Sequence, residues 1–320
     1  MSRFDVFNGD ADGICALHQL RLAEPADNAE LVTGVKRDIS LLKRVTAGAG
    51  DQVTVCDISM EKNQEPLLRL LEAGAEVTYF DHHMPGEIPS HPGLQAHIDT
   101  APDVCSSILV DRHLGGRFRL WAVTAAFGDN IIDSARHLAG EMGLSAEQSA
   151  ALEELGICLN YNGYGTTLED LFFHPADLYR KVHPYADPFA FINEDAAFAT
   201  LRDGYRGDMA SAAAIQPELA EEQVALYVFP DTDWARRVSG VYGNDLAQQY
   251  PERAHAILTR LDEGYRVSVR APLTTRTGAA DLCNEFPTGG GRKGAAGINL
   301  LPDDQLPRFI DRFRAQFSPA

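Results

Sequence analysis

The sequence predicts an α/β protein whose parallel sheet carries helices on both faces, and three observations support this class. Short apolar runs alternate with helical patterns over residues 1–145, as in a sheet whose strands are joined by crossover helices. Helical patterns dominate residues 146–220, where the apolar content is too high for a disordered linker. A second set of strands and helices follows over 221–320. We therefore expect an N-terminal parallel-sheet domain, a helical connector and a smaller C-terminal α/β domain.

In the N-terminal domain, apolar periodicity defines the expected elements. Strands are predicted at 4–7, 29–34, 53–57 and 77–80, and helices at 14–22, 64–73 and 106–113. The apolar run 120–127 is interpreted as a further strand-like segment that ends at Gly128-Asp129-Asn130. The ends of parallel strands lie at one edge of a sheet, which is where ligands bind in such folds.

The C-terminal domain is expected to combine a hairpin with flanking helices. Strands are predicted at 224–229, 254–261 and 265–270, with residues 262–264 as the hairpin turn. One helix is expected to begin near Tyr242, and an amphipathic helix at 307–317 is the last element. Between them lies a glycine-rich segment, 289–297, followed by the strand-like residues 298–301.

Composition excludes several classes of protein. The chain has 320 residues, of which 45% are hydrophobic, and a net charge of −18. Such an acidic surface disfavours long nucleic acid, whose binding depends on Lys and Arg. The five cysteines form no CxxC pair, which favours a reducing compartment. The sequence shows neither the apolar core of a signal peptide nor an apolar stretch long enough to span a membrane. We therefore expect a cytoplasmic protein that does not bind membranes.

Acidic side chains follow four of the apolar runs, and this is the main functional signal. Residues two apart in an extended chain point the same way, so Asp10 and Asp12 reach one side of the sheet edge. The shared edge would collect five carboxylates and two imidazoles, from Asp10, Asp12, Asp57, Asp81-His82-His83 and Asp129.

Divalent cations would remove the repulsion among so many carboxylates. A site rich in oxygen that also has an imidazole suits Mn²⁺ or Mg²⁺ better than Zn²⁺. Two ions about 3.5–4 Å apart would activate a water and stabilise charge on a phosphoryl group. Taken singly, the aspartates are also compatible with helix caps or turns, and only their shared placement favours a metal site.

The glycine-rich segment 289–297 is a second signal. Glycines let backbone amides approach an anion closely, and Arg292 and Lys293 add positive charge. Arg270 ends the strand 265–270 and is another basic residue in an acidic chain. The alternative interpretation is that segment 289–297 is only a tight connection between neighbouring elements and binds no anion.

In this order, the motifs resemble those of the DHH phosphoesterase superfamily with a C-terminal DHHA1 domain, in the branch of RecJ-like, oligoribonuclease and exopolyphosphatase-related proteins. Asp10-Ala11-Asp12-Gly13 is similar to the first motif, Asp57 to the second, Asp81-His82-His83 to the third and Gly128-Asp129 to the fourth. The segment 289–297 resembles the DHHA1 signature. The resemblance covers nearly the whole chain outside the helical connector.

The resemblance implies two Mn²⁺ ions, with Mg²⁺ as an alternative, in the N-terminal domain. His83 would contact the phosphate or donate a proton, and Asp81 would orient the site. The implied metal ligands, with Asp57 as the bridge, are Asp10, Asp12, Asp57, His82 and Asp129. The implied substrate-binding residues of the C-terminal domain are Arg270, Gly290, Gly291, Arg292 and Lys293.

At two positions the sequence departs from the family pattern. Many relatives have a histidine where this chain has Val6, so that Asn8 is the nearest polar side chain. Arg292 stands where the glycine-rich signature usually has a histidine. Both departures bear on substrate preference.

The leading hypothesis is a metal-dependent phosphoesterase that hydrolyses phosphodiester or phosphomonoester bonds of small nucleotides or short oligonucleotides. A hydrolase of pyrophosphate or polyphosphate is one alternative, which the absent upstream histidine disfavours. A non-catalytic nucleotide sensor is another, which the intact ligand set disfavours. The helical connector is compatible with a homodimer surface or a lid, and its Tyr161 and Tyr164 with base stacking or core packing.

Overall fold

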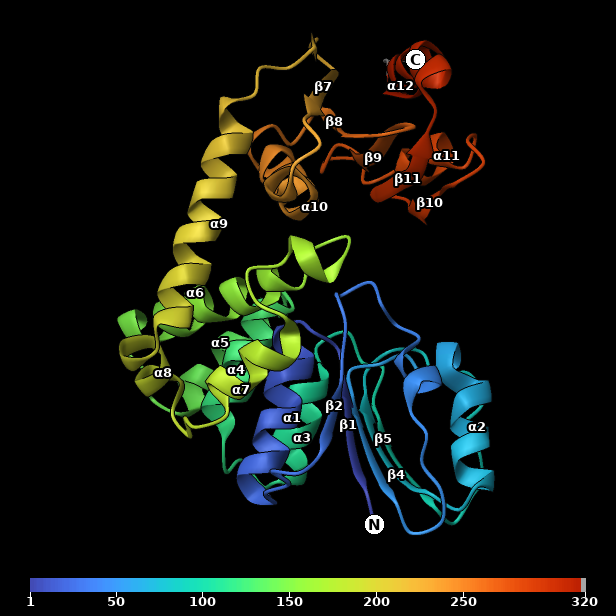
Figure 1. Ribbon diagram of the computed structural model, residues 1–320. Helices are drawn as coiled ribbons and strands as arrows, with labels where there is room; N and C mark the ends of the chain where they lie inside the picture. Colours follow the sequence, from blue (N-terminus) through green and yellow to red (C-terminus); the bar gives the residue numbers. More distant parts are fainter. Residues whose placement is uncertain (318–320) are drawn as a thin grey trace. The chain divides into compact units, whose positions relative to one another are not determined.

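The computed structural model describes residues 1–317 of the chain. Contacts divide the chain into two compact units, Met1–Gly204 and Tyr205–Ala320, and the division falls within helix α9 (Ala196–Ala214). Each unit has its own sheet and its own apolar core (Figure 1).

The sheet of the N-terminal unit is parallel throughout, as predicted, and its strand order is β2-β1-β3-β4-β5. The strands are β1 (Arg3–Phe7), β2 (Glu30–Val32), β3 (Gln52–Cys56), β4 (Glu76–Asp81) and β5 (Leu94–Ile98). The sequence analysis missed β5. In the register, Phe7 pairs with Cys56 and Cys56 with Phe80, so three central strands end level with one another. The residues that follow these ends therefore meet at one edge.

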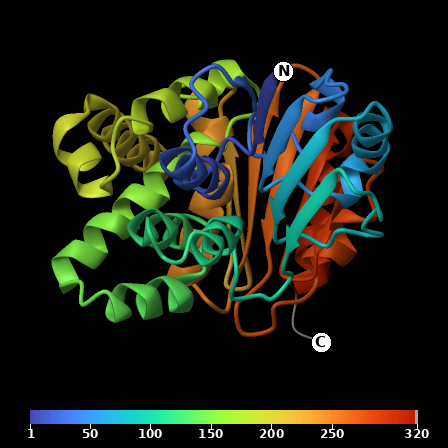
Figure 2. The same ribbon diagram turned by 90° about the horizontal axis from the view of Figure 1, so that it is seen from below.

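Helices cover both faces of this sheet, as the sequence predicts. Helix α1 lies on one face and helix α2 on the other (Figure 2). Separate apolar cores form on the two sides, one around Phe7, Phe80 and Trp121 and one around Val55 and Leu70. The helices are α1 (Ala11–Ala23), α2 (Gln64–Glu72), α3 (Ser106–His113), α4 (Arg119–Gly128), α5 (Ile132–Glu141), α6 (Ala146–Asn162), α7 (Pro175–Val182), α8 (Pro188–Glu194) and α9.

One element of this unit differs from the prediction. The apolar run 120–127 forms helix α4 and not a strand-like segment. Its residues are nearly all buried, because α4 packs against α1, α3 and α6. A short run that is apolar on every side cannot be assigned to helix or strand by periodicity, and its alanines and leucine favour the helix.

The C-terminal unit contains a mixed sheet in the order β10-β11-β9-β8-β7-β6, in which β7 and β8 are the one parallel pair among the described residues. The predicted hairpin of β8 and β9 is confirmed. The strands are β6 (Leu219–Ala220), β7 (Val224–Phe229), β8 (Ala254–Leu261), β9 (Gly264–Arg270), β10 (Gly289–Arg292) and β11 (Ala295–Leu301). The helices are α10 (Asp233–Gln249), α11 (Ala279–Cys283) and α12 (Leu306–Phe317).

The predicted start of one helix in this unit was wrong: α10 begins at Asp233, well before Tyr242, and runs through Gly240 and Gly243. The glycine-rich segment forms the antiparallel pair β10 and β11, joined at Lys293-Gly294.

Within residues 1–317, no helix combines the length and hydropathy that a membrane span requires. All five cysteines are buried and free, as their apolar contexts predict. Tyr161 is 1% exposed and belongs to the packed interior, whereas Tyr164 is only partly buried.

His18 of α1 is a buried titratable group away from the sheet edge. Its Nε2 lies 2.8 Å from the carbonyl oxygen of Tyr185, and its ring packs edge-on against Trp121. Nδ1 is buried and has no hydrogen-bond partner. Burial lowers the pKa of His18 to about 4, because a charged ring would leave a second N–H unsatisfied.

We therefore predict that neutral His18 contributes stability that is lost in acid. In the unfolded chain its pKa is about 6.5, so the unfolded state takes up the proton first as the pH falls. The contribution is present above that pH and declines towards pH 4, by roughly 3 kcal/mol at about 1.4 kcal/mol per pKa unit. Urea midpoints measured between neutral pH and pH 4.5 should fall less for His18→Phe than for the wild type. His137→Gln, at an exposed site of α5, is the control, and equal declines in all three proteins would contradict the assignment.

Candidate metal centre

The first two carboxylates come from the turn between β1 and α1. Asp10 is the N-cap of α1, and its Oδ1 accepts a hydrogen bond from the backbone N–H of Gly13 at 3.1 Å. Gly9 and Gly13 allow this tight turn, since a Cβ on Gly13 would lie 2.2 Å from the carbonyl oxygen of Asn8. Asp12, the second residue of α1, therefore lies at the same edge of the sheet as Asp10.

Asp12 is fixed by the N-terminus of another helix. Its two carboxylate oxygens accept hydrogen bonds from the backbone N–H groups of Ser106 and Ser107, both at 2.7 Å. These are the first residues of α3, whose unpaired N–H groups and dipole favour a negative charge. Asp12 is fully buried, and these two hydrogen bonds fix both of its oxygens.

Asp57 is the most strained and most crowded member of the cluster. It follows β3 directly, has a φ of 58° and is 2% exposed. Burial, together with the charges of Asp10 and Asp12, raises the pKa of Asp57 well above its usual range. Its Oδ1 is 3.4 Å from the hydroxyl of Ser106 and 3.4 Å from Nε2 of His82. The hydrogen bond from His82 offsets only part of this rise in the pKa of Asp57.

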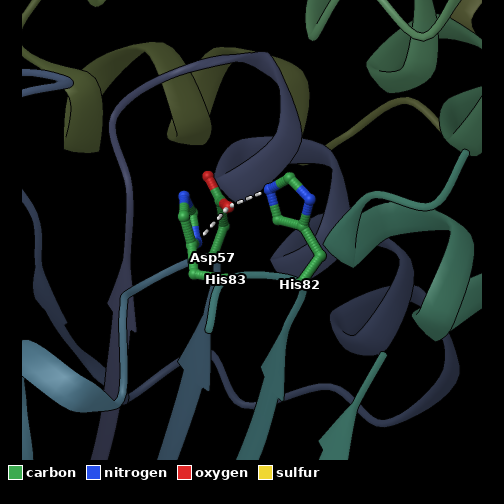
Figure 3. Close-up of side chains that lie close together, drawn as sticks. All are labelled: Asp57, His82 and His83. Carbon is green, nitrogen blue, oxygen red and sulfur yellow. Dashed lines mark ion pairs between the residues drawn. The ribbon is translucent and has the colours of Figure 1, made fainter. Parts of the chain in front are cut away.

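The two histidines approach Asp57 from the end of β4 (Figure 3). Nδ1 of His82 lies 3.0 Å from the carbonyl oxygen of Val104, which leaves Nε2 directed at the carboxylates. Burial alone would lower the pKa of His82, but the hydrogen bond to Asp57 and the nearby carboxylates raise it to about 10.

His83 is held in a different way. Its Nδ1 lies 2.7 Å from Oδ1 of Asp81, which also accepts from the backbone N–H of His82. The side chain of His83 is 46% exposed, and its Nδ1 also lies 3.8 Å from Oδ1 of Asp57 (Figure 3). Asp81 is fully buried at the end of β4 and orients the ring.

Asp129 arrives from the end of α4. Gly128 permits the close approach of α4 to α6, since a Cβ there would lie 2.6 Å from the carbonyl oxygen of Gly156. Oδ2 of Asp129 lies 3.7 Å from Nε2 of His82. Burial raises the pKa of Asp129 to about 6, although a neighbouring lysine, Lys36, partly offsets this.

Among residues 1–317, two overlapping sets of side chains are close enough to hold an ion, and both use His82. One set is Asp57, His82 and His83, and the other is Asp12, His82 and Asp129. Because Nδ1 of His82 faces a carbonyl group, only its Nε2 is directed at the carboxylates, and the two sets share this nitrogen. Three carboxylates and one imidazole suit Mn²⁺ or Mg²⁺. The predicted ligands Asp12, Asp57, His82 and Asp129 are thus brought together.

Asp10 lies beside this group but faces Lys36, a residue that the sequence analysis missed. Nζ of Lys36 lies 2.5 Å from Oδ2 of Asp10, 3.3 Å from Oδ1 of Asp129 and 3.0 Å from Oδ1 of Asn160. The ammonium lowers the pKa of Asp10 although burial alone would raise it. Lys36 stands outside any recognisable motif, in the turn after β2, so only an isolated lysine in an acidic chain marks it.

The predicted substrate-binding residues belong to the C-terminal unit. Arg270 lies in one row of the sheet with Ala295 and Arg292, and side chains in such a row share a face. The Arg270 guanidinium donates to Oδ1 of Asn244 and to the carbonyl oxygen of Gly240, both in α10. Arg292 is exposed, as is the neighbouring Lys293.

Beside these arginines runs a row of small residues. Gly290, Gly297 and Ser268 pair across the same three strands. A Cβ on Gly290 would meet nothing within 4 Å, so open space lies above this part of the sheet.

The sequence matches no protein-family model and no curated protein. Solved structures, however, share the fold of the whole chain. A DHH-domain protein described as a member of a family of ribosomal proteins has a TM-score of 0.62 at 12% identity, over 98% of this chain and 86% of that one. The exonuclease RecJ bound to manganese has a TM-score of 0.62 at 17% identity, over 98% and 89%. The pGpG-specific phosphodiesterase PggH from Vibrio cholerae has a TM-score of 0.58 at 13% identity, over 99% of both chains.

This chain therefore has the fold of DHH-domain proteins, as its motifs predict. At these sequence identities the likeness establishes the fold alone.

The crowding at Asp57 predicts opposite effects of one substitution on stability and on metal binding. Asp57→Asn removes a charge that repels its neighbours, and asparagine tolerates the positive φ. Without metal, the variant should melt about 2–6 °C above the wild type, as expected for roughly 1–2 kcal/mol in a chain of this size. Adding Mn²⁺ should raise the melting temperature of the wild type but not that of the variant.

Asp103→Asn, at an exposed position of the same unit, is the matched control and should behave as the wild type. A metal-free Asp57→Asn protein that melts below the wild type would show that the carboxylate is not repelled there.

Proposed function

We propose that this chain is a metal-dependent phosphoesterase acting on small nucleotides or short oligonucleotides. The observation that carries the proposal is the convergence of Asp12, Asp57 and Asp129 on Nε2 of His82 at the sheet edge. In a protein without an ion this arrangement would cost stability, because buried like charges repel one another. Two fold neighbours, RecJ and PggH, are described as an exonuclease and a pGpG-specific phosphodiesterase.

Mn²⁺ is the proposed ion, with Mg²⁺ as an alternative. When bound, such an ion lowers the pKa of a water and offsets charge on a phosphoryl oxygen. Asp12, Asp57, His82 and Asp129 would hold it. A two-ion mechanism, which the family resemblance implies, would further require Asp57 as a bridge and Asp10 as a ligand on the far side.

The proposed general acid is His83. Asp81 holds its Nδ1, so that the exposed Nε2 can give a proton to the leaving oxygen. The side chain of Asp81 is buried and fixes the orientation of the ring. His83 is thereby available to the substrate, whereas His82 is committed to the ion.

The proposed nucleotide-binding surface is the open part of the C-terminal sheet. Arg270 and Arg292 flank Ala295, and the open space above Gly290 in the neighbouring row leaves room for a phosphate or ribose beside these arginines. A net charge of −18 disfavours long polymers, so the positive charge at this surface suits a short ligand.

The test is hydrolysis by the purified chain with Mn²⁺ of pGpG, 3′-phosphorylated nucleotides, short oligoribonucleotides and cyclic dinucleotides. We expect turnover of at least one nucleotide, and no turnover after chelation or in Asp57→Asn. His83→Asn should retain Mn²⁺ binding and lose activity by about 10²-fold or more, the usual effect of removing a general acid.

Pyrophosphate and polyphosphate belong in the same series. Release of phosphate from these alone would replace the proposal with an inorganic phosphoanhydride hydrolase. Binding of nucleotides without turnover of any substrate would leave a sensor. Loss of Mn²⁺ binding in His83→Asn would show that His83 is a ligand and not the acid.

A further inference from the structure

The ammonium of Lys36 contacts Asp10 and Asp129, and the position of the lysine is fixed by α6 and the residues after it. Its backbone N–H donates to the carbonyl oxygen of Gly163 at 2.9 Å, and its ammonium lies 3.0 Å from Oδ1 of Asn160. The amide nitrogen of Asn160 in turn donates to the hydroxyl of Tyr164 at 2.8 Å. The aromatic ring of Tyr164 has its centroid 5.8 Å from Nζ. These contacts together hold the lysine at this edge.

The ammonium engages the carboxylate that a second ion would need. Oδ1 of Asp10 accepts from the N-terminus of α1, and Oδ2 accepts from Lys36 at 2.5 Å. Asp10 accordingly belongs to neither set of side chains that could hold an ion, among the residues that the structure describes. A second ion at Asp10 would have to displace Nζ or sit against it, at a cost in like-charge repulsion.

Asp129 divides its two oxygens between the lysine and the proposed ion. Oδ1 lies 3.3 Å from Nζ of Lys36, and Oδ2 lies 3.7 Å from Nε2 of His82. The same carboxylate thus faces a fixed cation on one side and the ion position on the other. In a two-ion site a bridging carboxylate binds both metals. In this chain the carboxylate of Asp129 would instead lie between one metal and the ammonium of Lys36.

We propose that the Lys36 ammonium takes the place of one of two divalent ions, so that this chain binds a single ion at the Asp12, Asp57, His82 and Asp129 position. The inference rests on the proposed metal-dependent function and deepens it. Lys36 is a positioning residue in this account: it neutralises Asp10, orients Asp129 and keeps a permanent positive charge beside the place of the scissile phosphate.

A fixed ammonium differs from an ion in two measurable ways. It cannot dissociate, so the dependence of binding on Mn²⁺ should follow a single-site curve. It also carries half the charge of a divalent ion and no open coordination position. The chain should therefore depend on its single ion and on His83 for the chemistry, and not on a pair of ions.

The test is the number of Mn²⁺ ions bound per folded chain, measured by electron paramagnetic resonance and by elemental analysis after removal of free metal. We expect the wild type to bind about one ion, with the spectrum of an isolated Mn²⁺. Lys36→Met keeps the length of the side chain and removes its charge, which frees Asp10. This variant should bind about two ions, with the spectrum of an exchange-coupled pair.

Two further variants separate charge from folding. Lys36→Arg keeps the positive charge and should bind one ion like the wild type. Lys43→Met removes a charge from an exposed lysine of the same unit and should also bind one ion.

A wild type that binds two ions as a coupled pair would overturn the inference whatever the variants do, and so would a folded Lys36→Met protein that binds only one. If Lys36→Met fails to fold, the wild-type spectrum decides alone. Binding of no divalent ion by any of the proteins would overturn the inference and the proposed function together, whereas two ions in an active wild type would overturn the inference only.

Discussion

Repulsion among buried carboxylates at one edge of the sheet is the constraint on which the site depends. Asp10, Asp12, Asp57 and Asp129 meet where three level strands and helix α4 end. Lys36 compensates Asp10 and Asp129, and the N-terminus of α3 compensates Asp12. The partner of Asp57 is Nε2 of His82, at 3.4 Å, and burial beside Asp10 and Asp12 still raises the pKa of Asp57.

The surrounding fold serves to keep these groups in place against their repulsion. Glycines at the β1–α1 turn and at the end of α4 let the backbones approach closely enough to bring Asp12 and Asp129 to the same point. The parallel register places Asp57 beside the end of β4, where its backbone N–H is bonded to Phe80. A site of this kind lowers the stability of the metal-free protein, and a bound cation would return that stability.

Much of the site could be predicted from the sequence, because strand ends in a parallel sheet share one edge. This argument placed Asp10, Asp12 and Asp57 correctly. Asp129 was expected for a partly wrong reason: the apolar run before it is a helix, and periodicity does not distinguish the two in a short buried run. The structure places Asp129 beside the other carboxylates, whereas the strand predicted before it is wrong.

Other features depend on long-range contacts that no local pattern records. The carbonyl oxygen of Val104 selects which nitrogen of His82 faces the carboxylates. Lys36 reaches Asp10 across 26 residues and Asn160 across 124. In the C-terminal unit, the glycine-rich segment is paired in β10 and β11, where a Cβ on Gly289 or Gly297 would clash with backbone carbonyl oxygens of neighbouring segments.

Anomalous diffraction from crystals grown with Mn²⁺ is the most direct test of whether the carboxylates around His82 form a divalent-cation site. We expect a strong peak at the manganese edge within bonding distance of Nε2 of His82 and of Asp57. A map in which these side chains keep their positions, with Mn²⁺ in the crystal but no peak among them, would contradict it.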